Sequence, residues 1–306
     1  MIDIRRQSRP SGRSTLFIAT ALCSALALAG CASTGTGSST GAGKTGEKGA
    51  SAADTDIASG ATKAKSDAAL REAAISSTKT QDYVAAAAYW GGLYDRNADD
   101  MEAALNYSRS LRQIGSIAQA LTVMQRAKQA HPDDAAVLGE YGKTLAASGR
   151  PDQAQANLAR ANELKPGDWT VLSAEGVALD QLGRYDEAQS RYADALKLEP
   201  GNPSVLTNLG LSYALQGNLD EAETVLRKAV ADSRANASAR QNLAVVLGLK
   251  GNFDEATRLA RSDLPQNVAD NNIAYLRDML TQPALWKQME TLDGKTAQAA
   301  PATSTP

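Results

Sequence analysis

The sequence predicts an all-α protein, a superhelical solenoid of stacked helical hairpins, and three observations support this fold class. Residues of the same kind recur every 34 positions between about residue 67 and residue 270. Each repeat contains two stretches with the apolar spacing of amphipathic helices. A Gly separates the two stretches in most repeats, and a Pro follows the second stretch in several of them. Periods of this length are typical of solenoids, because each unit buries its apolar face against its neighbours.

The repeat is visible as aligned columns that keep their phase without an insertion or a deletion. One small column is Ala86, Ala120, Ala154, Ala188, Ala222 and Ala256. A second small column is Ser108, Gly142, Gly176, Gly210 and Ala244, and a large one is Leu111, Leu145, Leu179, Tyr213 and Leu247. Small residues at these positions let two helices approach closely, and larger residues fill the space between neighbouring hairpins.

Three further columns mark the ends of the helices. The turn column is Gly115, Gly149, Gly183, Gly217 and Gly251, the acidic column is Asp152, Asp186, Asp220 and Asp254, and the proline column is Pro132, Pro166 and Pro200. Gly favours the left-handed conformation at a helix C-terminus. The acids are expected to cap the second helix by accepting free N–H groups, which we favour over a catalytic role. Pro ends the second helix.

This pattern resembles the tetratricopeptide repeat over residues 67–270, as six units. The first unit departs from it, because Gln81 replaces the turn Gly and Ala98 replaces the Pro. The sixth departs through Arg240 at an inner apolar position and Asp263 at a small one. Such departures are expected of capping repeats, whose outer faces meet water. We predict a final amphipathic capping helix over residues 271–290 and a disordered tail over residues 291–306.

Residues 1–30 have the layout of a secretory signal, a basic stretch followed by an apolar run that ends in small residues. The apolar run is shorter than the roughly 20 residues that a membrane-spanning helix needs. Leu28-Ala29-Gly30-Cys31 resembles the bacterial lipobox. The resemblance implies that Cys31 is acylated and becomes the first residue of the mature chain. The alternative is a plain signal peptide with an incidental Cys.

Residues 31–66 predict a flexible linker behind the lipidated Cys31. The stretch is mostly Ser, Thr, Gly and Ala, with almost no large apolar residue, so it cannot bury enough surface to fold alone. Ala32 rather than Asp follows Cys31. In the best-known sorting rule for such lipoproteins, this sends the anchor to the outer membrane, on its periplasmic face. We therefore expect the solenoid to be preceded by a flexible, lipid-anchored N-terminal tether.

The remaining chemistry argues against catalysis. Removing residues 1–30 takes away four arginines and one aspartate and changes the net charge from −2 to about −5, whereas nucleic-acid binding calls for a basic face. His131 is the sole histidine, so neither a metal site nor a Ser–His–Asp set can be assembled. We expect no enzyme activity, no small-molecule substrate, no metal and no cofactor apart from the covalent lipid on Cys31. Trp90, Trp169 and Trp286 predict core or cap packing.

A stacked solenoid offers a concave surface built mainly from first-helix residues. The candidates for a peptide-binding groove are Asn106, Arg109, Lys143, Ser173, Val177, Asn208, Leu211, Asn242 and Val245, with Glu140 beside them. Asn106, Asn208 and Asn242 share one position in the repeat, where an amide could pair with the backbone of an extended peptide. The alternative is that Asn is simply common there.

The whole pattern resembles the tetratricopeptide-repeat lipoproteins of the Tad (Flp) pilus assembly system. The resemblance is carried by the lipobox, the small-residue tether, the number of repeats and the closing Asn272-Ile273-Ala274-Tyr275-Leu276-Arg277 helix. It implies protein partners, above all the pilus secretin or other Tad components, whose localisation or assembly the chain would assist. A lipoprotein serving another envelope machine stays open, such as a type IV pilus pilotin, an outer-membrane protein insertion complex or an activator of a cell-wall enzyme.

Overall fold

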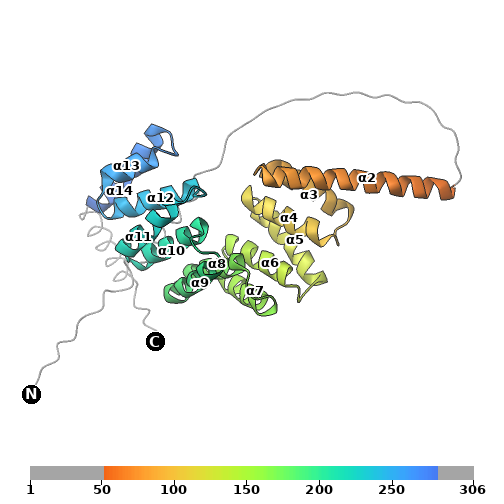
Figure 1. Cartoon of the computed structure of the whole chain (residues 1–306), viewed down its shortest axis with the longest axis horizontal. Coiled ribbons are helices and arrows are strands. Elements are labelled where there is room, and N and C mark those ends of the chain that lie inside the picture. The colour runs from red at the N-terminus through yellow and green to blue at the C-terminus, as the bar shows by residue number, and fades with distance from the viewer. Residues whose placement is uncertain (1–51, 282–306) are drawn as a thin grey trace, which may run out of the picture. The chain divides into compact units, whose positions relative to one another are not determined.

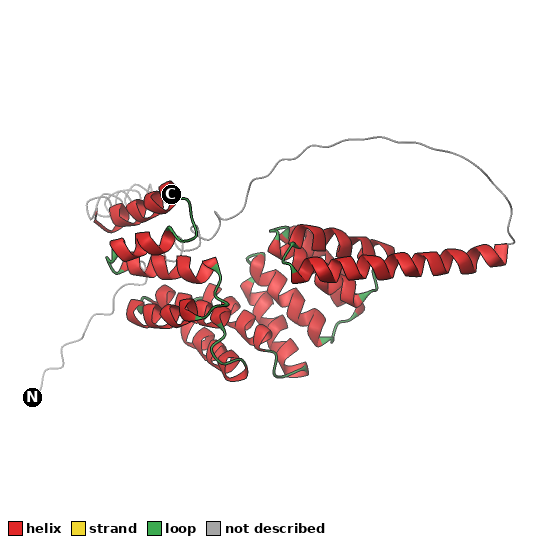
Figure 2. Ribbon diagram, turned by 45° about the horizontal axis from the view of Figure 1, so that its top comes forward, coloured by secondary structure: helices red, strands yellow, loops and turns green. Residues whose placement is uncertain are grey.

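The computed structural model describes residues 52–281, with their side chains over residues 66–280. In that part of the chain it contains thirteen α-helices joined by short loops (Figures 1 and 2). The first seven are α2 (Ala52–Lys79), α3 (Tyr83–Arg96), α4 (Met101–Gln113), α5 (Ile117–Ala130), α6 (Ala135–Ala147), α7 (Pro151–Leu164) and α8 (Trp169–Gln181). The others are α9 (Tyr185–Leu198), α10 (Pro203–Gln216), α11 (Leu219–Ala231), α12 (Ala237–Leu249), α13 (Phe253–Ala260) and α14 (Gln266–Thr281). The predicted all-α, paired-helix fold is confirmed.

The chain divides into two compact units, Met1–Arg191 and Tyr192–Pro306, and the boundary falls within α9. In the first unit α2 packs against α3, α4 against α5 and α6 against α7 (Figure 1). In the second unit α10 packs against α11 and α12 against α13. Within residues 52–281, no helix combines the length and the apolar character that crossing a bilayer requires.

Close approach of the two helices in a hairpin explains the second small column. A Cβ atom on Gly142 would lie 2.5 Å from Cγ of Leu158, and one on Gly210 would lie 2.5 Å from Cγ of Leu226. Both leucines are fully buried. A side chain larger than hydrogen at either glycine would therefore force the two helices apart, as the sequence pattern predicted.

The turn column has the backbone conformation that the sequence predicted. All five glycines have φ between 73° and 92°, and a Cβ atom at any of them would meet nothing within 4 Å. Backbone conformation alone therefore favours Gly at these positions. Gln81, which replaces Gly in the first repeat, keeps the same conformation, with φ of 59°. It is the sole residue other than Gly with positive φ in the described part of the chain.

The capping prediction for the acidic column is wrong in its mechanism. Asp152, Asp220 and Asp254 lie in the first turn of α7, α11 and α13, two positions after the cap residue, and the residues at the cap position make no side-chain cap hydrogen bond. These acids can still complement the helix dipole. Apart from Asp82, which caps the second helix α3, these side-chain caps belong to the first helices, in a 34-residue column that the sequence reasoning missed: Asp100, Asp134, Asp168, Asn202 and Asn236.

One ion pair accounts for both departures in the sixth repeat. Arg240 Nε donates to Asp263 Oδ2 at 2.8 Å, and Arg240 Nη2 donates to Asp263 Oδ1 at 2.5 Å. The hydrogen bonds from Arg240 hold the pKa of Asp263 below its usual value. The two substitutions are therefore complementary, because each charge is stabilised by the other in a bidentate pair.

Both ends of the repeat region differ from the predicted boundaries. The helix α2 begins at Ala52, inside the stretch 31–66 that was expected to be linker. Ala is the strongest helix former, and this helix does not need large apolar residues along its whole length. The helix expected over 271–290 begins earlier, at Gln266, where the Pro265 carbonyl accepts the first helical hydrogen bonds. Cys31, the signal over residues 1–30, Trp286 and the tail 291–306 lie outside the described residues.

The capping difference predicts unequal effects of two matched substitutions. In Asp134→Ala, the N–H groups of Ala136 and Val137 lose a shared acceptor at 2.9 Å, so we expect the free energy of unfolding to fall by about 1 kcal/mol. In Asp152→Ala only a favourable dipole interaction is lost, about 0.3 kcal/mol. Urea unfolding followed by circular dichroism measures both, and a larger loss in Asp152→Ala would contradict the assignment.

The conformation of Gln81 predicts a stabilising substitution. Because a residue with a Cβ atom pays roughly 1 kcal/mol for the left-handed conformation, Gln81→Gly is expected to raise the free energy of unfolding by about that amount. Gly149→Ala, at the equivalent turn with φ of 73°, is the reverse control and should lower stability by a similar amount. A thermal melt that moves both variants in the same direction would refute the explanation.

Candidate functional site

The first helices of successive repeats lie against one another within each unit. In the first unit α4 contacts α6 and α6 contacts α8; in the second, α10 contacts α12 and α12 contacts α14. In the described part of the chain the second helices, such as α5 and α7, approach each other less closely. The side of each stack on which neighbouring helices are closer is its inner side, so the first helices form that side. We call their solvent-facing residues the first-helix face of each unit.

The predicted groove residues lie on these faces but differ in accessibility. Arg109 is exposed; the half-buried residues are Asn106, Lys143, Val177, Asn208, Leu211 and Val245. Ser173 and Asn242 are each only 7% exposed. These last two therefore contribute mainly to packing, and a partner would meet the other seven.

The amide of Asn106 is partly used within its own helix. Its Nδ2 donates to the Glu102 carbonyl at 2.9 Å, and its Oδ1 accepts a hydrogen bond from Arg109 Nη1 at 3.2 Å. These bonds favour a local structural role for Asn106. They also hold the Arg109 side chain over the first-helix face of the first unit.

A buried carboxylate organises this face in the first unit. The Glu140 side chain on α6 is 1% exposed. Its Oε1 accepts hydrogen bonds from Arg112 Nε at 2.9 Å and Ser108 Oγ at 3.2 Å, and its Oε2 accepts from Arg112 Nη2 at 3.2 Å and Arg109 Nε at 3.4 Å. The carboxylate therefore ties α6 to α4. Burial of this charge is tolerable because two guanidinium groups and a hydroxyl satisfy it.

Sequence reasoning named Glu140 and Arg109 but missed Arg112. A signal was present, because Glu140 occupies the repeat position that holds Asn in three other repeats. A charged residue in a column of neutral amides indicates that a compensating charge lies nearby. The repeat period alone could not identify that partner, since Arg112 belongs to the preceding repeat.

Lys143 completes the polar part of the face. Its Nζ donates to Thr170 Oγ1 on α8 at 2.7 Å. Burial lowers the pKa of Lys143, Glu140 and Asp168 oppose this effect, and Arg112 and Arg109 lower the pKa further. The three cationic side chains are therefore close enough to influence one another.

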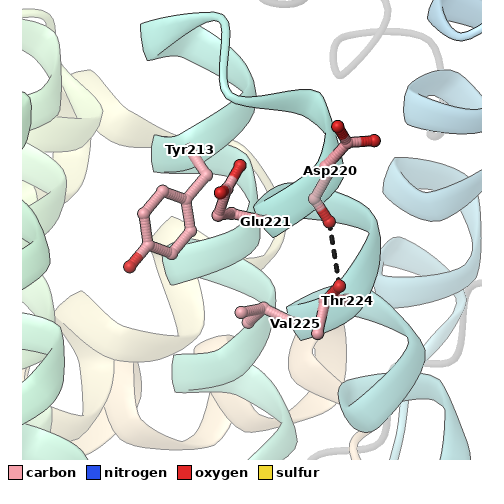
Figure 3. Close-up of a pocket in the computed structure, with 5 residues that line it drawn as sticks. All are labelled: Tyr213, Asp220, Glu221, Thr224 and Val225. Atoms are coloured by element: carbon pink, nitrogen blue, oxygen red, sulfur yellow. Dashed lines mark hydrogen bonds between the residues drawn. The ribbon is translucent and has the colours of Figure 1, made fainter.

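The first-helix face of the second unit has a different chemistry. Leu211 and Val245, at the repeat position of Arg109 and Lys143, are half-buried and apolar. A hollow of about 210 Å³ lies between α10 and α11 in this unit (Figure 3). Tyr213 and four residues of α11 line it, and within it Thr224 Oγ1 donates to the Asp220 carbonyl at 2.9 Å. It includes none of the predicted groove residues.

The histidine and the tryptophans singled out in the sequence contribute to helix ends and to packing. His131 is the residue at which α5 ends, and its N–H donates to the Ala127 carbonyl. Trp90 is 2% exposed, and its Nε1 donates to Thr78 Oγ1 at 3.2 Å, as expected for core packing. Trp169 begins α8 and is half-buried. Among the described residues no group of three His, Cys, Asp or Glu side chains could hold a metal ion.

Two family models match this architecture. Both describe the tetratricopeptide repeat: one matches residues 68–135 and 173–238, and the other matches residues 111–174 and 213–280. Together the two models span the described repeats from the end of α2 to α14. The chain belongs to the tetratricopeptide-repeat family. Its members are scaffolds that mediate protein–protein interaction and are typically non-catalytic, and this chain is such a scaffold.

Solved structures of the same fold are also similar. A thermophilic tetratricopeptide-repeat protein of Thermus thermophilus is 21% identical, with a TM-score of 0.53 over 59% of this chain and 98% of that one. PilW, described as a widely conserved type IV pilus biogenesis factor, is 19% identical, with a TM-score of 0.53 over 64% of this chain and 91% of that one. A MamA structure (MSR-1) is 30% identical, with a TM-score of 0.42 over 54% and 94%. A comparison with curated proteins yields no significant match.

The Glu140 network predicts a large effect for a small substitution. Glu140→Gln leaves the guanidinium groups of Arg109 and Arg112 without their carboxylate, so we expect the free energy of unfolding to fall by about 3 kcal/mol. The matched control is Glu163→Gln, which removes an exposed carboxylate 3.2 Å from Arg160 Nη1 and should cost less than about 0.5 kcal/mol. Urea unfolding measures both variants, and equal losses would mean that Glu140 is not a structural tie.

Proposed function

We propose that the chain is an outer-membrane lipoprotein that helps the secretin of a Tad (Flp) pilus to localise or assemble, in the manner of TadD. Acylated Cys31 would attach it to the periplasmic face of the outer membrane. The segment after Cys31 would give the repeats reach away from the bilayer. The first-helix faces would hold a segment of the partner, and the chain would act by recruitment rather than by catalysis.

The observation that carries the proposal is the combination of an accessible inner face with a lipobox. Seven of the nine candidate residues keep accessible surface on the first-helix faces, and the lipobox ends at Cys31. PilW, which shares the fold, is a type IV pilus biogenesis factor. At 19% identity this similarity supports the architecture alone, and a role in a type IV pilus machine is kept as the second candidate.

The test separates anchoring from recognition. In cells that make Tad pili, Cys31→Ser is expected to leave a folded protein that no longer fractionates with the outer membrane, because the thiol that carries the lipid is gone. Secretin multimers in that fraction should then decrease about tenfold or more, as measured by immunoblotting of unheated membranes. Normal multimers with Cys31→Ser would refute recruitment through the anchor.

Photo-crosslinking identifies the machine. A photoreactive amino acid at Leu211, on the first-helix face, should crosslink the secretin or another Tad component. The same amino acid at Val84, which is 69% exposed on α3, is the control and should not. Crosslinks from Leu211 to components of a type IV pilus would favour the second candidate and overturn the Tad assignment.

A further inference from the structure

We propose that Arg109, Arg112 and Lys143 on the first-helix face of the first unit form a binding site for an acidic, carboxylate-rich segment of the protein partner. We call these three residues the basic cluster. This inference deepens the proposed function and rests on the first-helix face being the partner's site.

The basic cluster has more positive charge than its own carboxylate neutralises. Glu140 is the acid that both guanidinium groups share, and the Lys143 ammonium group donates to a neutral hydroxyl, Thr170 Oγ1. Of the nearby acids, Glu102 pairs with Arg71, whereas Asp168 caps α8 and still acts on Lys143 through its charge. Three cationic side chains therefore face two carboxylates, Glu140 and Asp168, which leaves an excess of one positive charge.

Two basic residues elsewhere in the described part of the chain show the opposite balance. Arg227 lies between two acids, Glu223 and Glu255, at 2.8 Å from each. Lys250 likewise contacts Asp220 at 2.5 Å and Glu223 at 2.6 Å. The basic cluster departs from this pattern, and it does so on a chain whose net charge is −2. An acidic segment would be repelled by most of the surface and attracted here, which favours binding at one place.

The cluster is also pre-organised, and two of its three side chains are partly buried. Glu140 and Asn106 already fix the guanidinium group of Arg109, so little side-chain entropy remains to be lost on binding. The Arg112 side chain is only 20% exposed, and Lys143 is half-buried. A carboxylate on a projecting side chain reaches Arg112 and Lys143 more readily than the headgroups of a flat bilayer do. This geometry favours an acidic protein segment over an anionic membrane.

An incoming anion would also stabilise the charged form of Lys143. Burial and the two neighbouring guanidinium groups lower the pKa of Lys143. A carboxylate beside the ammonium group would counteract both effects and favour the charged form. The attraction between the carboxylate and the ammonium group is also less screened where the bound segment displaces water from the cluster.

The test uses the full chain in detergent and two fluorescein-labelled peptides, one of alternating Glu and Ser and one of alternating Gln and Ser. We expect the acidic peptide to bind about tenfold or more tightly than the neutral one by fluorescence anisotropy. Lys143→Gln and Arg109→Gln should each remove about tenfold in affinity, and added salt should weaken binding. The matched control is Arg160→Gln, on the second helix α7, with a side chain 49% exposed against 51% for Arg109.

Three outcomes would overturn the inference. The first is an acidic peptide that binds no better than the neutral one, including no binding of either. The second is an equal loss in Arg160→Gln and Lys143→Gln. The third is binding of the Cys31→Ser chain to phosphatidylglycerol vesicles, with a dependence on Lys143 that the peptide does not show. If Lys143→Gln is neutral but Cys31→Ser still disperses secretin multimers, the acidic-segment inference fails and the proposed function stands.

Discussion

The geometry of two hairpins, α6–α7 and α10–α11, depends on the contact between a glycine on the first helix and a leucine on the second. Gly142 against Leu158 and Gly210 against Leu226 leave no room for a Cβ atom. Interiors packed at crystal-like density do not tolerate a larger residue at such a contact. The same two positions hold other residues in the remaining repeats. In the last hairpin both hold alanine, Ala244 and Ala260, and both are buried.

Once the hairpins are fixed, the first helices of neighbouring repeats come together and form the face that can meet a partner. Residues at the same position in successive repeats supply the side chains of this face, so its chemistry can be followed along one column of the repeat. In the first unit the column gives Arg109 and Lys143 and then Val177; in the second it gives Leu211 and Val245. The helical scaffold is the same in both units, and the two units differ in the side chains at this position of the repeat.

Departures from the repeat are informative in different ways. Gln81 takes the place of a turn Gly at a cost in backbone strain, because the hairpin connection requires positive φ whatever the residue. Arg240 and Asp263 compensate each other, so two apparent defects are one interaction. Glu140 departs from a column of amides and is satisfied by residues of the preceding repeat. The first is a conformational departure, and the other two are electrostatic.

The sequence by itself determined the fold class, the phase of the helices, the turn glycines and the close-packed positions, because each depends on local conformation or on a period that neighbours in sequence share. It misplaced the helix caps, since an acid at the second position of a helix and one at its cap look alike until the backbone is seen. It also missed the start of α2 at Ala52 and the role of Arg112. Only the tertiary structure decided which charges lie together, because ion pairs such as Arg112–Glu140 and Arg240–Asp263 join residues 28 and 23 positions apart. Contacts at that separation depend on how the helices pack, which no single column of the repeat specifies.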